Sequence, residues 1–174
     1  MLLKNGSELT ICKAKKEDAQ KLLDYLDTVG GESDNLLFGA EGFGMTVEQE
    51  ERFIERLEAS QTSALFVGWI EDTIVGVGSI SAHARERVSH NCEIAISVLK
   101  AFWGMGIGTR MMHEMIDFAK RTNKLEIVHL GVRSDNTRAI ALYKKLGFRE
   151  IGLYPGFFKI DGKGYDEILM NLYL

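Results

Sequence analysis

Three glycines at alternate positions, Gly104, Gly106 and Gly108, form the stretch of this chain that most directly indicates chemistry. The apolar run at 92–99 before them is typical of a strand, and apolar residues at helical spacing follow them. Glycine lets backbone N–H groups approach a ligand closely, and the start of a helix presents unpaired N–H groups with a partial positive charge. The pattern therefore predicts an anion site, suited to a phosphate or pyrophosphate, where the strand passes into the helix.

Two familiar phosphate-binding patterns do not fit this stretch. A dinucleotide fingerprint needs a glycine at its sixth position, which is Thr109 when counted from Gly104 and Met111 when counted from Gly106. A Walker A loop needs Gly-Lys-Ser or Gly-Lys-Thr, and the sequence contains neither. A glycine-rich turn that binds nothing is the structural alternative.

A second motif, NTRAIALYKKLGF at 136–148, follows the next apolar strand. Together the two stretches resemble the signatures of the GNAT superfamily of acyl-CoA-dependent N-acetyltransferases. The stretch at 103–109 is similar to that family's pyrophosphate loop, and 136–148 is similar to its Asn-x-x-Ala-x-x-Leu-Tyr-x-x-x-Gly-Phe signature. The order of predicted elements from 9 to 172 also fits, so the resemblance covers nearly the whole chain.

The resemblance implies how the chain would hold acetyl-CoA. The loop backbone would anchor the pyrophosphate, with Thr109 adding a hydroxyl donor. Trp103 stands where the family usually has Arg or Gln, which removes a side-chain contact but leaves the backbone amides. The open strand edge near Ile96 and Val98 would pair with pantetheine, and a strand N–H at 96–98 would polarise the thioester carbonyl. The expected cofactor-binding residues are Ile96, Val98, Trp103, Gly104, Met105, Gly106, Ile107, Gly108, Thr109, Asn136, Ala139 and Tyr143.

Tyr143 matches the tyrosine of the second signature, which implies a general acid that protonates the sulfur of CoA. The alternative is a structural tyrosine that packs with Ala139, Leu142 and Leu146 on the inward face of its helix. Asn136 begins the same helix and is a predicted N-cap, and in the family this asparagine also touches the cofactor.

Glu93 is the predicted general base, because many family members carry a glutamate on this strand. The apolar neighbours Cys92 and Ile94 would partly desolvate its carboxylate and raise its pKa. The alternative is a solvated or ion-paired strand residue. The runner-up bases or amine-recognition groups are Glu32, Asp34, Glu41 and His90.

Hydrophobic patterning predicts the elements that position these residues. The expected helices are 15–28, 46–59, 109–121 and 136–146, and the expected strands are 9–12, 64–70, 73–82, 92–99, 125–132, 148–158 and 165–172. The fold class is α/β (α+β), with a mixed, mostly antiparallel sheet of about seven strands and helices on both faces. The unit at 92–132 is predicted to be a right-handed parallel crossover, and the resemblance implies that its two strands splay apart around the thioester.

Composition limits the partners. The chain of 174 residues predicts one domain, 1–174, and the net charge of −4 argues against nucleic acid. Neither a membrane span nor a signal-peptide core is visible, so a cytoplasmic protein is the default expectation. The scattered histidines lack metal-ligand spacing, so no metal is expected. Cys12 and Cys92 are predicted to be buried, inert thiols.

The sequence therefore predicts an acetyl-CoA-dependent N-acetyltransferase in which a primary amine attacks the thioester directly within a ternary complex. The acceptor wall is expected from 32–45 and 152–163, where Tyr154, Phe157 and Phe158 line it or instead form core or dimer contacts. The alternative function is a non-catalytic acyl-CoA-binding module that acts through a protein partner. The failed Rossmann and Walker patterns disfavour a nucleotide-binding protein. No sequence feature names the amine, sets the acyl chain length or demands a homodimer, although many relatives dimerise.

Overall fold

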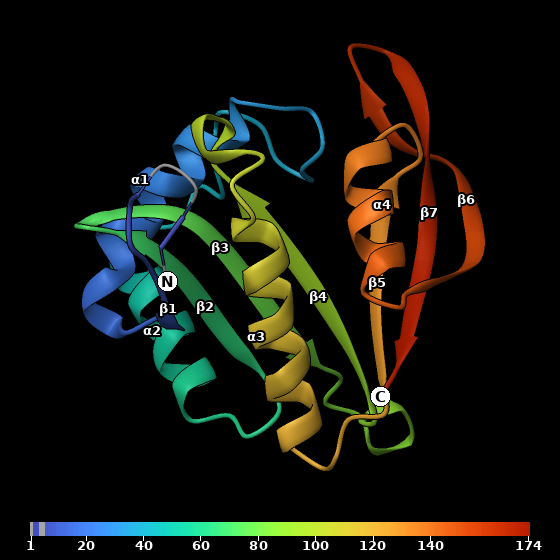
Figure 1. Ribbon diagram of the computed structural model, residues 1–174, viewed down its shortest axis with the longest axis horizontal. Helices are drawn as coiled ribbons and strands as arrows, with labels where there is room; N and C mark the ends of the chain where they lie inside the picture. Colours follow the sequence, from blue (N-terminus) through green and yellow to red (C-terminus); the bar gives the residue numbers. More distant parts are fainter. Residues whose placement is uncertain (1, 4–5) are drawn as a thin grey trace.

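The computed structural model describes residues 2–3 and 6–174 (Figure 1). Within them, seven strands form one mixed sheet in the order β1-β2-β3-β4-β5-β7-β6. The strands are β1 (Leu9–Lys13), β2 (Ala64–Ile70), β3 (Thr73–Ala82), β4 (Asn91–Val98), β5 (Ile127–Arg133), β6 (Arg149–Ile160) and β7 (Lys163–Tyr173). The α-helices are α1 (Ala19–Gly30), α2 (Val47–Glu58), α3 (Ile107–Arg121) and α4 (Thr137–Lys145). The predicted fold class is confirmed.

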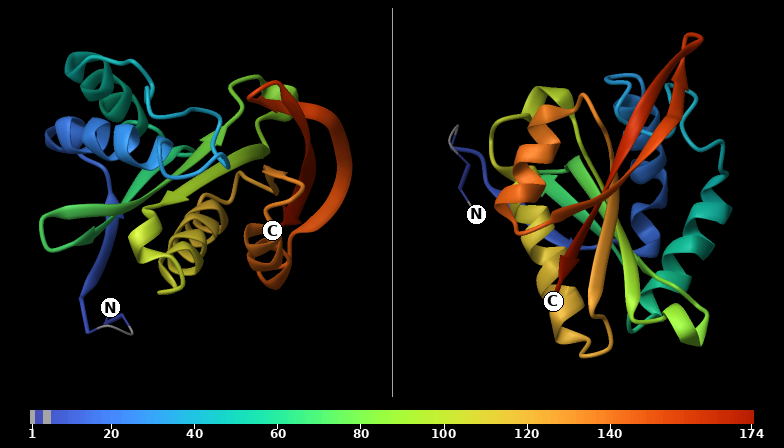
Figure 2. Two further views of the ribbon diagram at one scale, coloured as in Figure 1. Left: turned by 90° about the horizontal axis from the view of Figure 1, so that it is seen from above. Right: turned by 90° about the vertical axis from the view of Figure 1, so that its right-hand side faces the viewer.

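Helices cover both faces of the sheet (Figure 2). On one face α1 and α2 pack against β2 and β3 through a core that includes Leu22, Ile54 and Val67. On the other face α3 and α4 pack on a larger core that includes Met111 and Tyr143. The apolar stripe predicted for α3 is fully buried, and it fixes this helix across β1 to β4.

The helix ends follow local chemistry. Thr46 and Gln49 form a capping box at the start of α2, with Thr46 N–H donating to Gln49 Oε1 at 2.8 Å. α1 begins at Ala19, later than predicted, because residues 16–18 form a separate 3-10 turn. α3 begins at Ile107, two residues earlier than predicted, because left-handed Gly106 is its N-cap. Gly147 follows α4 with a φ of +96°, the left-handed conformation that commonly ends a helix.

β4 and β5 are parallel and diverge after a short contact. They pair at Asn91 with Ile127, Cys92 with Val128 and Glu93 with His129. β4 then continues to Val98 against β3 alone, while β5 continues against β7. Figure 1 shows the two strands spreading apart, with α3 over β4 and α4 beside β5. This is the splayed pair that the resemblance implied.

The last hairpin carries the sole proline. β6 is an edge strand whose register against β7 shifts between Tyr154 and Phe158, and an irregular edge of this kind accommodates Pro155. Among the thiols, Cys92 is buried, and burial raises its pKa to about 12. The prediction for Cys12 is wrong, because this residue lies on the edge strand β1 and is exposed. In the described part of the chain, no helix has both the length and the apolarity that a membrane crossing requires.

Candidate active site

The glycine-rich turn after β4 presents backbone donors at the start of α3. Gly104 and Gly106 have φ values of +83° and +87°, a conformation that side-chain-bearing residues rarely adopt. The N–H groups of the first turn of α3 have no intrahelical partner, and no side chain of the described residues caps them. A Cβ added at Gly106 would meet nothing within 4 Å, so the space beyond this backbone is open. The geometry is that of an anion site.

Trp103 ties this turn to the end of β4. Its indole Nε1–H donates to the Val98 carbonyl at 2.7 Å. The Arg138 guanidinium from α4 lies over the indole ring, 5.5 Å from its centroid, and beside Gly104. Arg138 was not among the residues predicted from the sequence. The available signal was its position in the first turn of the predicted second-signature helix, next to Asn136 of the motif.

The divergence of the strands leaves backbone groups of β4 open. Backbone directions alternate along a strand. The Leu99 N–H donates to a β3 carbonyl, and the His90 carbonyl accepts from a β5 N–H, so odd positions face β3 and even positions face β5. The N–H groups of Ile96 and Val98 therefore point to the side where β5 has separated. These are the strand donors that the sequence analysis expected in this region.

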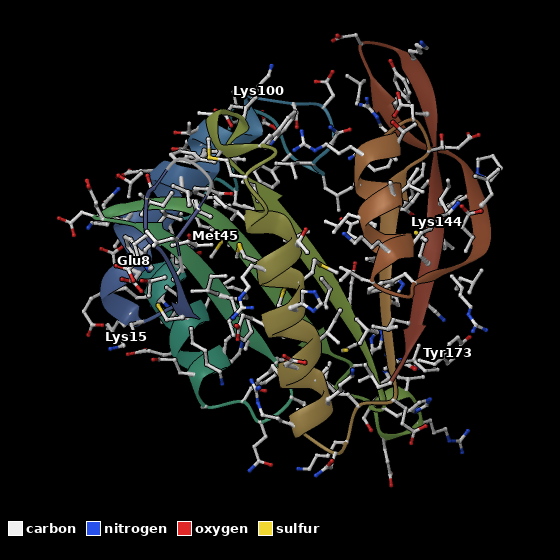
Figure 3. The ribbon with its side chains drawn as sticks, viewed as in Figure 1. Glu8, Lys15, Met45, Lys100, Lys144 and Tyr173 are labelled. Carbon is white, nitrogen blue, oxygen red and sulfur yellow. The ribbon has the colours of Figure 1, made fainter. Side chains whose placement is uncertain are left out.

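Tyr143 is the buried residue of α4, with 8% of its surface exposed. Burial raises the pKa of its hydroxyl to about 12. Its ring packs against Phe148 at a centroid distance of 5.9 Å, and its hydroxyl makes no hydrogen bond with the described residues. The neighbouring Lys144 lies on the exposed side of α4 and pairs with Glu150 at 2.7 Å (Figure 3). Tyr143 is therefore packed in the core, as the structural alternative predicted. Its hydroxyl is also available to donate a hydrogen bond.

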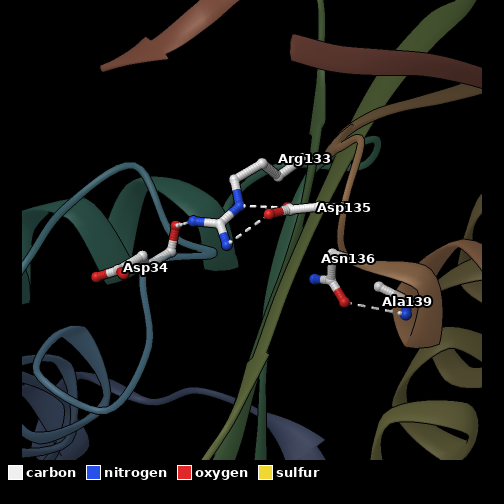
Figure 4. Close-up of polar contacts among 5 residues, drawn as sticks. All are labelled: Asp34, Arg133, Asp135, Asn136 and Ala139. Carbon is white, nitrogen blue, oxygen red and sulfur yellow. Dashed lines mark hydrogen bonds and ion pairs between the residues drawn. The ribbon is translucent and has the colours of Figure 1, made fainter. Parts of the chain in front are cut away.

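Asn136 is the N-cap of α4, as predicted. Its side-chain oxygen accepts from the Ala139 N–H at 3.2 Å (Figure 4). This bond uses the oxygen and leaves the amide N–H₂ group of Asn136 without a partner among the described residues. The backbone N–H of Ala139 is therefore occupied by this capping hydrogen bond.

Glu93 lies on the opposite face of the sheet from Tyr143. Alternation along β4 places it on the side of Ser97, whose hydroxyl is 3.0 Å from the Tyr25 hydroxyl of α1. The Glu93 side chain is exposed, so the predicted partial desolvation is wrong. The reason is that β5 turns away just beyond Glu93 and leaves this stretch of β4 without a covering neighbour. The predicted acid and base therefore flank the diverging strands from opposite sides.

The runner-up bases have other roles. Glu32 Oε2 accepts from the Lys100 N–H at 2.6 Å, just after β4. The Glu41 carboxylate accepts from its own N–H and from the Gly39 N–H, which lowers its pKa. The Asp34 side chain is exposed, and His90 lies at the closed end where β4 and β5 are paired. Of the three carboxylates, only that of Asp34 has no partner among the described residues, and it lies in the loop at 31–46.

The loop at 31–46 is fastened over the end of the sheet. Arg133 Nη1 at the end of β5 donates to the Asp34 carbonyl at 2.7 Å (Figure 4). The same guanidinium donates to both carboxylate oxygens of Asp135 at 2.6 and 3.2 Å and lies over the Tyr165 ring. The second attachment is the hydrogen bond that the Lys100 N–H donates to Glu32; Lys100 is labelled in Figure 3. Residues distant in sequence thus hold this loop against β4 and β5.

Glu167 of β7 is a candidate residue that the sequence analysis missed. Its side chain is 9% exposed, and it makes no hydrogen bond or ion pair with the described residues. Burial, and then the nearby charge of Glu93, raise the pKa of its carboxyl. No motif marks this position, because its importance depends on which strand lies beside β7.

The predicted aromatic wall is only partly accessible. Tyr154 and Phe157 are 54% and 40% exposed on the last hairpin, whereas Phe158 is 8% exposed. Phe157 contacts both other rings, tilted by 50° to Tyr154 and edge to face with Phe158, with centroids 5.2 and 5.1 Å apart. Among the residues that the structure describes, no group of three or more His, Cys, Asp or Glu side chains is arranged to hold a metal ion.

Comparisons with known proteins identify the same pattern. The family model described as the acetyltransferase (GNAT) family matches residues 36–148, from the fastened loop to the end of the second signature. The N-alpha-acetyltransferase RimI of Mycobacterium tuberculosis is 37% identical over 90 residues. That match spans 52% of this chain and 54% of the relative, or about half of each.

Solved structures share the arrangement of elements. The acetyltransferase of GNAT family from Streptococcus pneumoniae has a TM-score of 0.94 at 30% identity, covering 96% of this chain and 100% of that chain. The protein yncA from Salmonella typhimurium, solved with its cofactor acetyl-CoA, has a TM-score of 0.83 at 20% identity. The latter likeness covers 95% of this chain and 94% of that chain, and it is a likeness of fold.

Proposed function

Because the chain belongs to the acetyltransferase (GNAT) family, we propose that residues 1–174 form a single N-acetyltransferase domain that transfers the acetyl group of acetyl-CoA to a primary amine. The observation that carries the proposal is the short contact between β4 and β5. After three paired positions the strands diverge, and β4 presents open backbone donors beside the anion site of α3. A substrate that has a pyrophosphate and an amide-rich arm fits both features. The pyrophosphate suits the anion site, and the amides of the arm suit the open edge of β4.

Acetyl-CoA is a substrate of this site, and the described residues fit its chemistry. The N–H groups of residues 104–109 and the start of α3 would hold the pyrophosphate, with the Arg138 charge beside them. The open edge at Ile96 and Val98 would pair with the amides of the pantetheine arm. The Val98 carbonyl is already occupied by Trp103, so at this residue only the N–H remains to be used.

The thioester would then lie between the diverging strands, where a β4 N–H polarises its carbonyl. Backbone donors aimed at a developing oxyanion contribute about 3–4 kcal/mol of transition-state stabilisation. The amine nitrogen attacks the carbonyl carbon, the C–S bond breaks and the sulfur leaves as a thiolate. This direct attack requires both substrates to be bound together.

Tyr143 serves the leaving sulfur in this proposal. Its buried hydroxyl stays protonated across the physiological range, because its pKa is about 12. A free thiol has a pKa of about 8.5, so the phenol remains the weaker acid of the pair. We therefore assign Tyr143 to hydrogen-bond donation that stabilises the thiolate. The thiolate takes its proton from water when CoA leaves the site, which balances the proton that Glu93 releases to solvent.

Glu93 is the proton acceptor for the attacking amine. It lies on the face opposite Tyr143, at the point where the strands begin to diverge, and its carboxylate is exposed to water. An amine that enters from the side of α1 and the fastened loop would lose its proton to this carboxylate, which then releases it to solvent. The name of the Mycobacterium tuberculosis relative supports an α-amine at a peptide N-terminus as the acceptor.

Thiol release tests the proposal. The protein is incubated with acetyl-CoA and a panel of alkylamines, aminoglycosides and peptides with free N-termini, and free CoA is measured with a thiol reagent. The proposal predicts release that depends on the amine and on the protein. Acetyl-CoA binding by calorimetry without release for any amine would instead support a non-catalytic acyl-CoA-binding module.

A further inference from the structure

Glu167 lies on the sheet face that the amine is proposed to approach. On β7, alternation places it with Leu169 and Asn171, while Ile168 and Met170 face the core beneath α3 and α4. Its side chain leans across the neighbouring strand β5. A Cβ added at Gly131 would collide with the Glu167 carboxylate, so the glycine makes room for it. The carboxylate is thereby directed toward β4 and Glu93.

No cation of the described residues balances this carboxylate. Arg133 is its register partner on β5, but that guanidinium is held by Asp135, by the Asp34 carbonyl and over the Tyr165 ring. His129 is the register partner of Glu93 and lies on the same face. The charge of Glu93 acts on Glu167 strongly enough to raise the pKa of the latter's carboxyl further.

An unpaired carboxylate that is nine-tenths buried is unfavourable for the fold. Burying a charged group without a partner costs free energy, and a second carboxylate nearby adds repulsion. A positive charge entering between the two groups removes both penalties at once. The protein keeps this arrangement beside the diverging strands, where the proposed acceptor must bind.

We propose that Glu167 is a specificity-determining carboxylate of the acceptor site, which with Glu93 selects amines that arrive as alkylammonium cations. The inference rests on the proposed function. Glu167 holds the cation, and the exposed Glu93 takes one proton from the ammonium nitrogen so that its electron pair attacks the thioester carbon. Neutral arylamines lack the charge that this pair of carboxylates recognises.

Two acceptors of nearly the same shape separate charge from size. At neutral pH 4-methoxybenzylamine is a cation, whereas 4-methoxyaniline is neutral. A tripeptide with a free N-terminus provides a second cationic acceptor. The measured quantity is kcat/KM for each acceptor, together with KM for acetyl-CoA, for the wild type, Glu167→Gln and Gly131→Ala. Glu126→Gln, an exposed glutamate before β5, is the matched control for the charge change.

The inference predicts that Glu167→Gln lowers kcat/KM for the cationic acceptors at least tenfold relative to 4-methoxyaniline, with KM for acetyl-CoA unchanged. Gly131→Ala displaces the Glu167 carboxylate and should reproduce this loss, while Glu126→Gln should match the wild type. A wild-type protein that prefers the neutral arylamine, or a Glu167→Gln variant with an unchanged preference, overturns the inference and leaves the proposed function standing. A wild-type protein that binds acetyl-CoA but acetylates no acceptor contradicts the proposed function and the inference with it.

Discussion

Two buried titratable side chains define the site at the scale of single residues. Burial leaves Tyr143 protonated, with a pKa of about 12, so its hydroxyl remains a donor at every pH at which the protein would work. Burial also raises the pKa of Glu167, but there the charged form is the one that the acceptor would need. Desolvation therefore favours the protonated form that Tyr143 needs as a donor. In Glu167 it disfavours the charged form that would bind a cationic acceptor.

Replacing Tyr143 by Phe removes the hydroxyl and keeps the packing against Phe148. We expect kcat to fall at least tenfold, because a hydrogen bond to a charged group such as the leaving thiolate contributes about 1.5–3 kcal/mol, with KM for acetyl-CoA nearly unchanged. Steady-state kinetics and circular dichroism provide the measurements. Tyr173→Phe, at an exposed position near the C-terminus, is the control. An unchanged kcat in Tyr143→Phe would remove the hydroxyl from the mechanism.

Glu167 should also make stability depend on pH. Its folded-state pKa is raised by burial and by Glu93, so the charged carboxylate destabilises the fold at pH values above that pKa. The penalty disappears as the pH falls through the folded pKa and the group becomes protonated. Thermal unfolding should therefore give a higher Tm for Glu167→Gln than for the wild type at pH 8. The difference should shrink toward pH 4, and a constant difference would rule out this electrostatic origin.

At the scale of elements, the strand, the glycine turn and α3 act as one unit. β4 supplies open N–H groups, the left-handed glycines turn the chain, and α3 presents the donors of its first turn. Trp103 locks the turn to the end of β4, and Arg138 joins α4 to it. Since α3 is anchored by a fully buried apolar stripe, its N-terminus is held rigidly against the sheet.

The conformation of Gly106 offers a test of this unit. An alanine there would adopt the left-handed conformation at a cost of about 1–2 kcal/mol and would place a methyl group in the open space of the anion site. We expect at least a tenfold loss of acetyl-CoA affinity by calorimetry. Gly162→Ala, in the β6–β7 turn with a φ of +79°, carries similar strain away from the site. Equal affinities for the two variants would show that the turn does not hold the substrate.

The loop at 31–46 depends on Arg133. Arg133→Ala removes the hydrogen bonds to Asp34 and Asp135 and the contact with Tyr165. We expect faster chymotrypsin cleavage within the loop, at Phe38 or Phe43, and a several-fold higher KM for the amine because the acceptor wall becomes mobile. Arg110→Ala, an exposed arginine in an i,i+4 pair with Glu114, should cleave at the wild-type rate. Unchanged cleavage of Arg133→Ala would mean that Glu32 and Lys100 suffice to fasten the loop.

At the scale of the whole molecule, the sheet places three independently predicted parts around one opening. The glycine turn, the signature helix α4 and the central strand were visible in the sequence because each depends on local spacing. Asn136 and the Thr46–Gln49 capping box were predictable for the same reason. These local signals, joined by the family resemblance, were enough to indicate the fold and the cofactor side of the site.

The acceptor side depends on strand neighbours that no local pattern records. Glu167 matters because Gly131 lies beside it on β5, and the pairing of β5 with β7 joins residues far apart in the chain. The exposure of Glu93 was mispredicted because it follows from the point at which β5 leaves β4. Cys12 was mispredicted in the same way, since its apolar neighbours do not reveal that β1 is an edge strand.

Intact-mass spectrometry tests direct transfer within a ternary complex. The wild-type protein is incubated with acetyl-CoA alone and with acetyl-CoA plus a peptide that has a free N-terminus, and the masses of both polypeptides are measured within the time of a few turnovers. Direct transfer predicts one added acetyl group on the peptide amine, and an unmodified protein when acetyl-CoA is present alone. A protein that becomes acetylated first and then passes the group to the peptide would contradict direct attack by the amine.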